Sequence, residues 1–179
     1  MAMTACLSPT PPSISALDAA DIDAEYDVII ALPNTVLADL PPGSASFVGH
    51  AGAEISGDAD GSVVGDMVMN VNFAGNTIDG TIDNLNVVDF DGIPEQLLGG
   101  SLTISGAETD GALTATASGN LTAVGEESVR GTSYVTLNMV GDVRTDTSNG
   151  DTVVGTVSGS GNGDFDLTIY DGGFFESSN

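Results

Sequence analysis

The sequence contains no lysine and no tryptophan, and its only cations at neutral pH are Arg130 and Arg144. Against these stand 26 aspartates and glutamates, which give a formal net charge of -24. The electric field of so negative a protein repels phosphate groups, so we expect neither nucleic acid nor an anionic membrane surface as a partner. The charge indicates a strongly solvated surface, or alternatively attraction of cations or of a basic partner protein.

Reactive side chains are equally scarce. Cys6 is the only cysteine, so an intramolecular disulfide is excluded, and no histidine lies near it in sequence to activate the thiol. His50 is the only histidine, and nothing in the spacing supports a catalytic triad through it. The glycines punctuate strand-like runs and do not open helices, so phosphate-binding and dinucleotide-binding loops are not predicted. The sequence therefore predicts a protein that is not an enzyme.

Long apolar runs are missing as well, since none approaches the ~18 residues of a membrane-spanning helix. The first residues nevertheless look like the end of a bacterial lipoprotein signal. Residues 3–5 occupy lipobox positions, Cys6 would be the acylated residue, and a Pro/Ser-rich stretch follows. The basic and apolar parts of such a signal are not in the sequence, so Cys6 could instead be an ordinary thiol. We expect acylation, with residues 1–13 as a lipobox-like segment and flexible tether.

One helix is expected, over residues 14–32. Its alanines favour a helix, Ser15 or Asp18 could cap it, and Pro33 should end it. An apolar stripe at helical spacing would cover one end of the main domain; it comprises Ile22, Tyr26, Ile29 and Ile30. Residues 14–42 are thus interpreted as an N-terminal helix and a connector.

From Gly43 onward, short runs alternate apolar and polar residues between Gly, Asn and Asp turns. In residues 67–83 the apolar positions are Met67, Met69, Val71, Phe73, Ile78 and Ile82. Strands are expected at 44–51, 62–73, 77–88, 99–105, 112–124, 128–140, 151–159 and 164–171. Short turns favour antiparallel pairing, and closure would remove the sheet edges.

The expected fold is therefore all-β: an eight-stranded antiparallel up-and-down soluble β-barrel, residues 43–179, preceded by one short helix. A two-sheet sandwich is the alternative, because periodicity does not separate the two. The chain has only 3 Tyr and 6 Phe, which do not form two belts at strand ends, so the apolar face should point inward and not into lipid. His50 should then lie at the surface or the barrel rim.

Four segments resemble the transferrin-binding-protein-B-like β-barrel domain. They are "PPGSASFVGHAG", "GSVVGDMVMNVNFAGNTIDGTIDNL", "GSLTISGAETDGALTATASGNLT" and "VVGTVSGSGNGDFDLTIYDGGFF". The first resembles the opening strand of that domain, although Phe47 stands where Tyr is common. The second resembles its second hairpin, and the others resemble its later strands and closing hairpin. The resemblance covers about residues 42–176 and is a pattern of strands and glycines, not a catalytic signature.

The resemblance implies a lipid-anchored protein of the outer membrane, facing the cell surface or the periplasm. Family members often act as binding modules, and the best-known ones capture host iron or haem proteins through loops and an additional handle domain. We expect a single barrel here and carry over none of their binding residues. We expect a protein or small ligand to bind at rim loops around residues 51–61, 89–98 and 141–150. A structural subunit of an assembly, such as a virion decoration or surface-layer protein, is the alternative, and a ligand carrier that uses the barrel interior is a third interpretation.

Acidic turns are the only candidate metal sites. Carboxylates two residues apart in Gly-containing turns suit calcium, although neither of the first two turns has a full calcium-loop ligand set. The candidates for weak divalent-metal binding are Asp58, Asp60, Asp89, Asp91, Asp142 and Asp146. Solvated hairpin turns explain the same residues more simply, and no other cofactor is expected.

Overall fold

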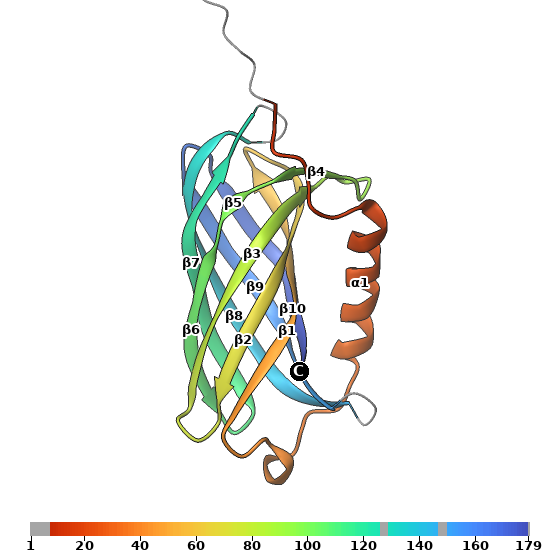
Figure 1. Ribbon diagram of the computed structural model, residues 1–179, viewed down its shortest axis with the longest axis vertical. Helices are drawn as coiled ribbons and strands as arrows, with labels where there is room; N and C mark the ends of the chain where they lie inside the picture. Colours follow the sequence, from red (N-terminus) through yellow and green to blue (C-terminus); the bar gives the residue numbers. More distant parts are fainter. Residues whose placement is uncertain (1–7, 126–128, 147–149, 179) are drawn as a thin grey trace, which may run out of the picture.

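The computed structural model describes residues 8–125, 129–146 and 150–178, and it forms a β-barrel with one helix beside it (Figure 1). The order of elements begins with α1 (Ala16–Ile30) and a short 3-10 turn, η1 (Leu37–Asp39). The strands are β1 (Ser44–Gly57), β2 (Gly61–Asn72), β3 (Thr77–Val88), β4 (Pro94–Leu97), β5 (Gly99–Gly100), β6 (Leu102–Thr109), β7 (Ala112–Ala123), β8 (Gly131–Asp146), β9 (Gly150–Gly163) and β10 (Leu167–Ser178).

The sheet closes because β1, the first strand, pairs with β2 on one side and with β10, the last strand, on the other. The remaining long strands follow in sequence order, with β3 paired to β2 and β6, and β10 to β9. The short strands β4 and β5 only extend the pairing of β3 and β7. The prediction of an eight-stranded up-and-down barrel is therefore confirmed, and the sandwich is not formed.

The inward face of each strand carries the apolar residues that the two-residue period predicted. Met67, Met69 and Val71 of β2 are buried, whereas Phe73 at the following turn is only partly buried. Alternate residues of the other long strands complete one continuous core, among them Leu113, Ala117, Leu137, Met139, Leu167 and Ile169. Burial of this contiguous apolar surface is the main stabilising contribution to the barrel.

Helix α1 lies along the outside of the barrel, where it packs against β9 and β10 (Figure 1). It begins with a capping box in which Ser15 and Asp18 satisfy each other's backbone N–H groups, so both predicted capping residues are used. These hydrogen bonds also lower the pKa of Asp18. At the other end, Arg144 of β8 donates a 2.7 Å hydrogen bond to the carbonyl of Leu32.

The residues on either side of α1 are attached to opposite rims of the barrel. Before the helix, the amide of Leu97 donates to the carbonyl of Thr10, and the amide of Ser13 donates to Asn86 Oδ1 at 2.8 Å. After the helix, Asn34 forms a bridge with Arg144. Part of the segment expected to be a tether therefore lies along the upper rim as it appears in Figure 1. Cys6 lies outside the described residues.

Two of the loops expected to carry binding are largely strand. β1 continues to Gly57 and β8 to Asp146, so most of residues 51–61 and part of residues 141–150 belong to the barrel wall. The inward residues here include Ala51 and Ala53, whose small side chains give a weak alternation signal in the sequence. His50 consequently lies in the middle of β1 on its outer face, and not at the barrel rim.

Candidate functional site

The barrel lumen is filled by its own side chains. The cavity inside it measures about 30 Å³ and is lined by apolar residues such as Ala51, Leu102 and Leu137. This is the volume of about one water molecule, whereas small-molecule sites start near roughly 300 Å³. The lumen therefore does not provide a ligand site, which argues against a carrier that uses the barrel interior.

Two carboxylates are nevertheless enclosed by the barrel. Glu108 accepts a 2.7 Å hydrogen bond from the amide of Gly111 and is 3% exposed. Glu176 is 0% exposed, and neither of its carboxylate oxygens has a hydrogen-bond partner. Burial raises the pKa of Glu176 to about 9, and the nearby backbone of Met69 opposes this only in part. Glu176 is therefore uncharged at neutral pH.

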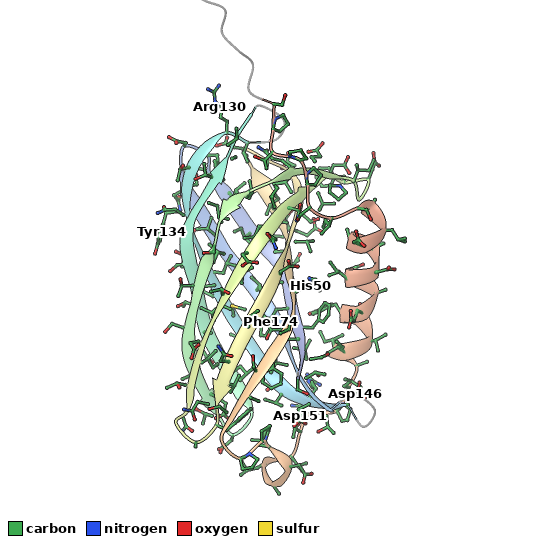
Figure 2. The ribbon with its side chains drawn as sticks, viewed as in Figure 1. His50, Arg130, Tyr134, Asp146, Asp151 and Phe174 are labelled. Atoms are coloured by element: carbon green, nitrogen blue, oxygen red, sulfur yellow. The ribbon has the colours of Figure 1, made fainter. Side chains whose placement is uncertain are left out.

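A groove of about 540 Å³ lies between α1 and the outer wall of the barrel. We call it the helix groove. Its floor is formed by β1, β2 and β10, and one side by α1. Its upper end is formed by residues 88–92, which comprise the last residue of β3 and the turn after it. Figure 2 shows His50 pointing from β1 into the space between the barrel and α1. The volume is that of an ordinary small-molecule site.

The floor of the helix groove follows from the strand register. Gly52 of β1 is paired with Gly173 of β10 on one side and with Val64 of β2 on the other. Two adjacent glycines leave the middle of the floor without side chains. A Cβ at Gly173 would overlap the ring of Tyr26, so glycine is required there for α1 to approach the wall.

Helix α1 forms the side of the groove opposite the strand floor, and its two halves carry side chains of different size. Its second half packs against the barrel, where Tyr26 and Ile29 meet Val154 and Phe175. Its first half instead presents alanines to the helix groove: Ala16, Ala19 and Ala20. These short side chains leave open the space that larger residues would fill. The groove is thus a consequence of alanine on the helix and glycine on the strand wall.

Aromatic and acidic side chains are distributed unevenly around the helix groove. Tyr26 and His50 both pack against Phe175, with ring centroids 6.3 Å and 5.8 Å from it. His50 Nδ1 lies 3.4 Å from Asp66 Oδ1 without forming a hydrogen bond. The remaining charged residues that line the groove are all acidic: Asp23, Glu54, Asp89, Asp91 and Asp171.

The acidic residues predicted as metal ligands occupy three separate places. Asp58 accepts a 2.8 Å hydrogen bond from the amide of Asp166, whereas Asp89 accepts from the amides of Asp91 and Ile93. Asp142 lies 3.8 Å from Arg144 at the opposite end of the barrel. Asp60 is exposed beside Asp58, and Asp146 ends β8. No group of three or more metal-ligating side chains occurs within the described residues.

Sequence reasoning placed Asp89 and Asp91 in a candidate site but missed the residues that form the groove around them. The helix was expected to cover one end of the domain, but it lies along the side wall of the barrel, because its apolar residues pack on the outer faces of β9 and β10. Nothing in the sequence said which strands it would meet. The usable signal was the change within α1 from alanines to Ile22 and Tyr26. In this structure Tyr26 and Ile29 pack the second half of α1 against the wall, and the alanines of the first half leave the space beside them unfilled.

Comparisons of the chain with protein-family models, with curated proteins and with solved structures found no match.

Proposed function

We propose that this protein is a non-enzymatic, lipid-anchored surface protein of the transferrin-binding-protein-B-like kind, acting as a binding module through the helix groove. The observation that carries the proposal is the contrast between a filled lumen and an open groove of about 540 Å³ on the outer wall. The barrel is then a rigid scaffold, and the ligand is held between the scaffold and α1.

The positions of the groove residues support binding and not catalysis. Ser62 is the only serine in the lining, and it is paired with Glu54, whereas His50 is paired with Asp66. Four ladder positions separate Ser62 from Asp66, which corresponds to roughly 13 Å along the strand. The hydroxyl therefore lies too far from the imidazole for proton transfer, which requires direct contact or one bridging water.

The upper rim supports the proposed anchor. Thr10 is attached to β4, so an acyl group on Cys6 would be joined to the rim by only a few residues. The barrel would then stand close to the outer-membrane leaflet, with the rim that carries Thr10 facing the lipid. Within the part of the chain that the structure describes, no helix is long and apolar enough to cross a membrane.

The binding role is tested by filling the helix groove. Ala19 lies on the groove side of α1 and is partly exposed, so Ala19→Phe should occupy the space without disturbing the core. In a nuclear magnetic resonance screen of small neutral, anionic and cationic fragments, we expect hits to shift the amides of Gly52 and Gly173. These shifts should disappear in Ala19→Phe. A screen without a groove-directed hit would refute the proposed binding role.

The anchor is tested separately with Cys6→Ser in the protein expressed from its native gene with its upstream sequence. We expect the wild-type protein to incorporate a fatty-acid probe and to fractionate with membranes, and the variant to do neither. Labelling that persists in Cys6→Ser would place the acyl group elsewhere. A wild-type protein that is never labelled, but is recovered in large particles, would favour a structural subunit of an assembly.

A further inference from the structure

The two ends of the helix groove differ in chemistry because of the strand register. The ladder positions nearest the lower end are His50 and Phe175, which are paired with each other. The middle positions are Gly52 and Gly173. The upper end carries Glu54 on the same outer face of β1. The floor therefore changes from aromatic, through bare backbone, to acidic along its length.

The helix groove as a whole concentrates a residue type that the chain otherwise uses sparingly. Tyr26, Phe90 and Phe175 all line the groove, and they are three of the 3 Tyr and 6 Phe in the whole sequence. Phe90 is 79% exposed at the upper opening, where its ring contributes little to the core. Aromatic faces attract organic cations as well as apolar groups.

The acidic end has no positive charge to balance it within the groove. Glu54 and Asp171 project from the floor, and Asp89 and Asp91 lie in the segment after β3. Neither arginine lines the groove, because Arg144 is engaged at the far end of α1 and Arg130 lies at the upper rim, pointing away from the barrel (Figure 2). The field at this end favours a cation and disfavours an anion.

The spacing of the two ends sets the length of a ligand that would reach both. His50 and Glu54 are four residues apart on one strand, or roughly 13 Å. Within this length, a ring against Tyr26, which lies over Gly173, would be about two residues, or roughly 7 Å, from a positive nitrogen beside Glu54, and a short alkyl chain joins the two over that distance. Tyr26 covers Gly173, whereas Gly52 leaves the floor open beside it, so the alkyl chain would cross over Gly52.

We propose that the helix groove binds a small amphiphilic amine, with its apolar ring at the Tyr26–Phe175 end and its ammonium group at the Glu54–Asp171 end. The proposal rests on the proposed binding function and names the class of ligand for the same groove. Binding combines burial of the ring with attraction between the ammonium group and the carboxylates.

The probes for this proposal are phenylbutylamine, phenylbutanol and phenylbutyrate, which share one apolar body and differ in charge. With the wild-type protein we expect the amine to shift the amides of Gly52 and Gly173 in a saturable way. The alcohol should bind roughly tenfold more weakly, and the carboxylate should not bind measurably. The affinity of the amine should fall as the salt concentration rises to about 0.5 M, while that of the alcohol should not.

Variants separate the groove from the general negative charge of the surface. Glu54→Gln combined with Asp171→Asn should lower the affinity for phenylbutylamine several-fold and leave that for phenylbutanol unchanged. Glu25→Gln removes one charge from an exposed position of α1 that does not line the groove, and should leave binding of both probes unchanged. Thermal unfolding of each variant confirms that the fold is retained.

The outcomes distinguish the ligand class from the binding function. If amine and alcohol bind equally and Ala19→Phe abolishes both, the groove is a binding site but the proposed ligand class is wrong. If the amine binds Ala19→Phe as well as it binds wild type, it is attracted to the acidic surface in general and the proposal is overturned. If no probe shifts the groove amides, the amine proposal fails, and the fragment screen alone then decides the binding function.

Discussion

Glu176→Gln is expected to make the protein more stable at about pH 8 and to reduce the dependence of its stability on pH. Glu176 has a pKa raised to about 9 in the folded protein, against 4.5 for a free side chain. Between these two pKa values, the folded state therefore keeps a proton on Glu176 that the unfolded state has released. The favourable contribution is complete below about pH 4.5 and is lost as the pH rises toward 9, at about 1.4 kcal/mol per pH unit.

Glutamine keeps the shape of the neutral carboxyl but cannot ionise. Its amide also brings donors into the lumen without partners, which costs about 1–3 kcal/mol. We therefore expect Glu176→Gln to lie between equal to wild type and about 2 kcal/mol less stable at about pH 5, and to be more stable than wild type by roughly 2–4 kcal/mol at about pH 8. Urea unfolding at a series of pH values measures both effects.

Two further measurements identify Glu176 as the cause. Glu25→Gln removes one exposed negative charge and should keep the wild-type slope of stability against pH, so it controls for the change in net charge. Infrared spectroscopy at neutral pH should show a protonated carboxyl group in the wild-type protein and not in Glu176→Gln. A wild-type slope that survives in Glu176→Gln would show that another group takes up the proton.

The sequence predicted the barrel well because the alternation of apolar and polar residues that specifies each strand lies within that strand. Inward residues such as Met69 and Leu137 alternate with polar ones, and most turns carry glycine or aspartate, so strand number and facing followed from the two-residue period. The strand ends were less well predicted. β8 runs to Asp146, beyond its expected end at 140, because strand pairing with β9 outweighs the weak local pattern there.

The helix groove could not be predicted from the sequence, because it depends on contacts between distant segments. Tyr26 meets Gly173, and His50 meets Phe175, only once the barrel has closed and α1 has folded back along it. The burial of Glu176 could not be predicted for the same reason, since its polar neighbours Ser177 and Ser178 suggest an exposed segment. Its burial follows from the pairing of Glu176 with Gly49, which places it on the inward face of β10.

Phe174→Ala is expected to cause the largest loss of stability of any substitution considered, about 3–5 kcal/mol. Phe174 is 1% exposed and points into the barrel (Figure 2). Its ring lies over Gly141 and Gly155, which face each other on β8 and β9. A Cβ at Gly155 would come within 2.5 Å of the ring, and one at Gly141 within 2.8 Å. The ring thus fills space that the two glycines provide.

Phe174→Leu is the matched variant, since it retains part of the ring's volume and should lose roughly half as much stability. Chemical unfolding of both variants at one pH gives the comparison. Gly155→Ala should not restore Phe174→Ala, because the new Cβ would also overlap the carbonyl of Val140. Glycine is therefore required at position 155 by the close approach of the Val140 carbonyl as well as by the ring of Phe174. A double variant as stable as wild type would show that Phe174 alone dictates glycine at position 155.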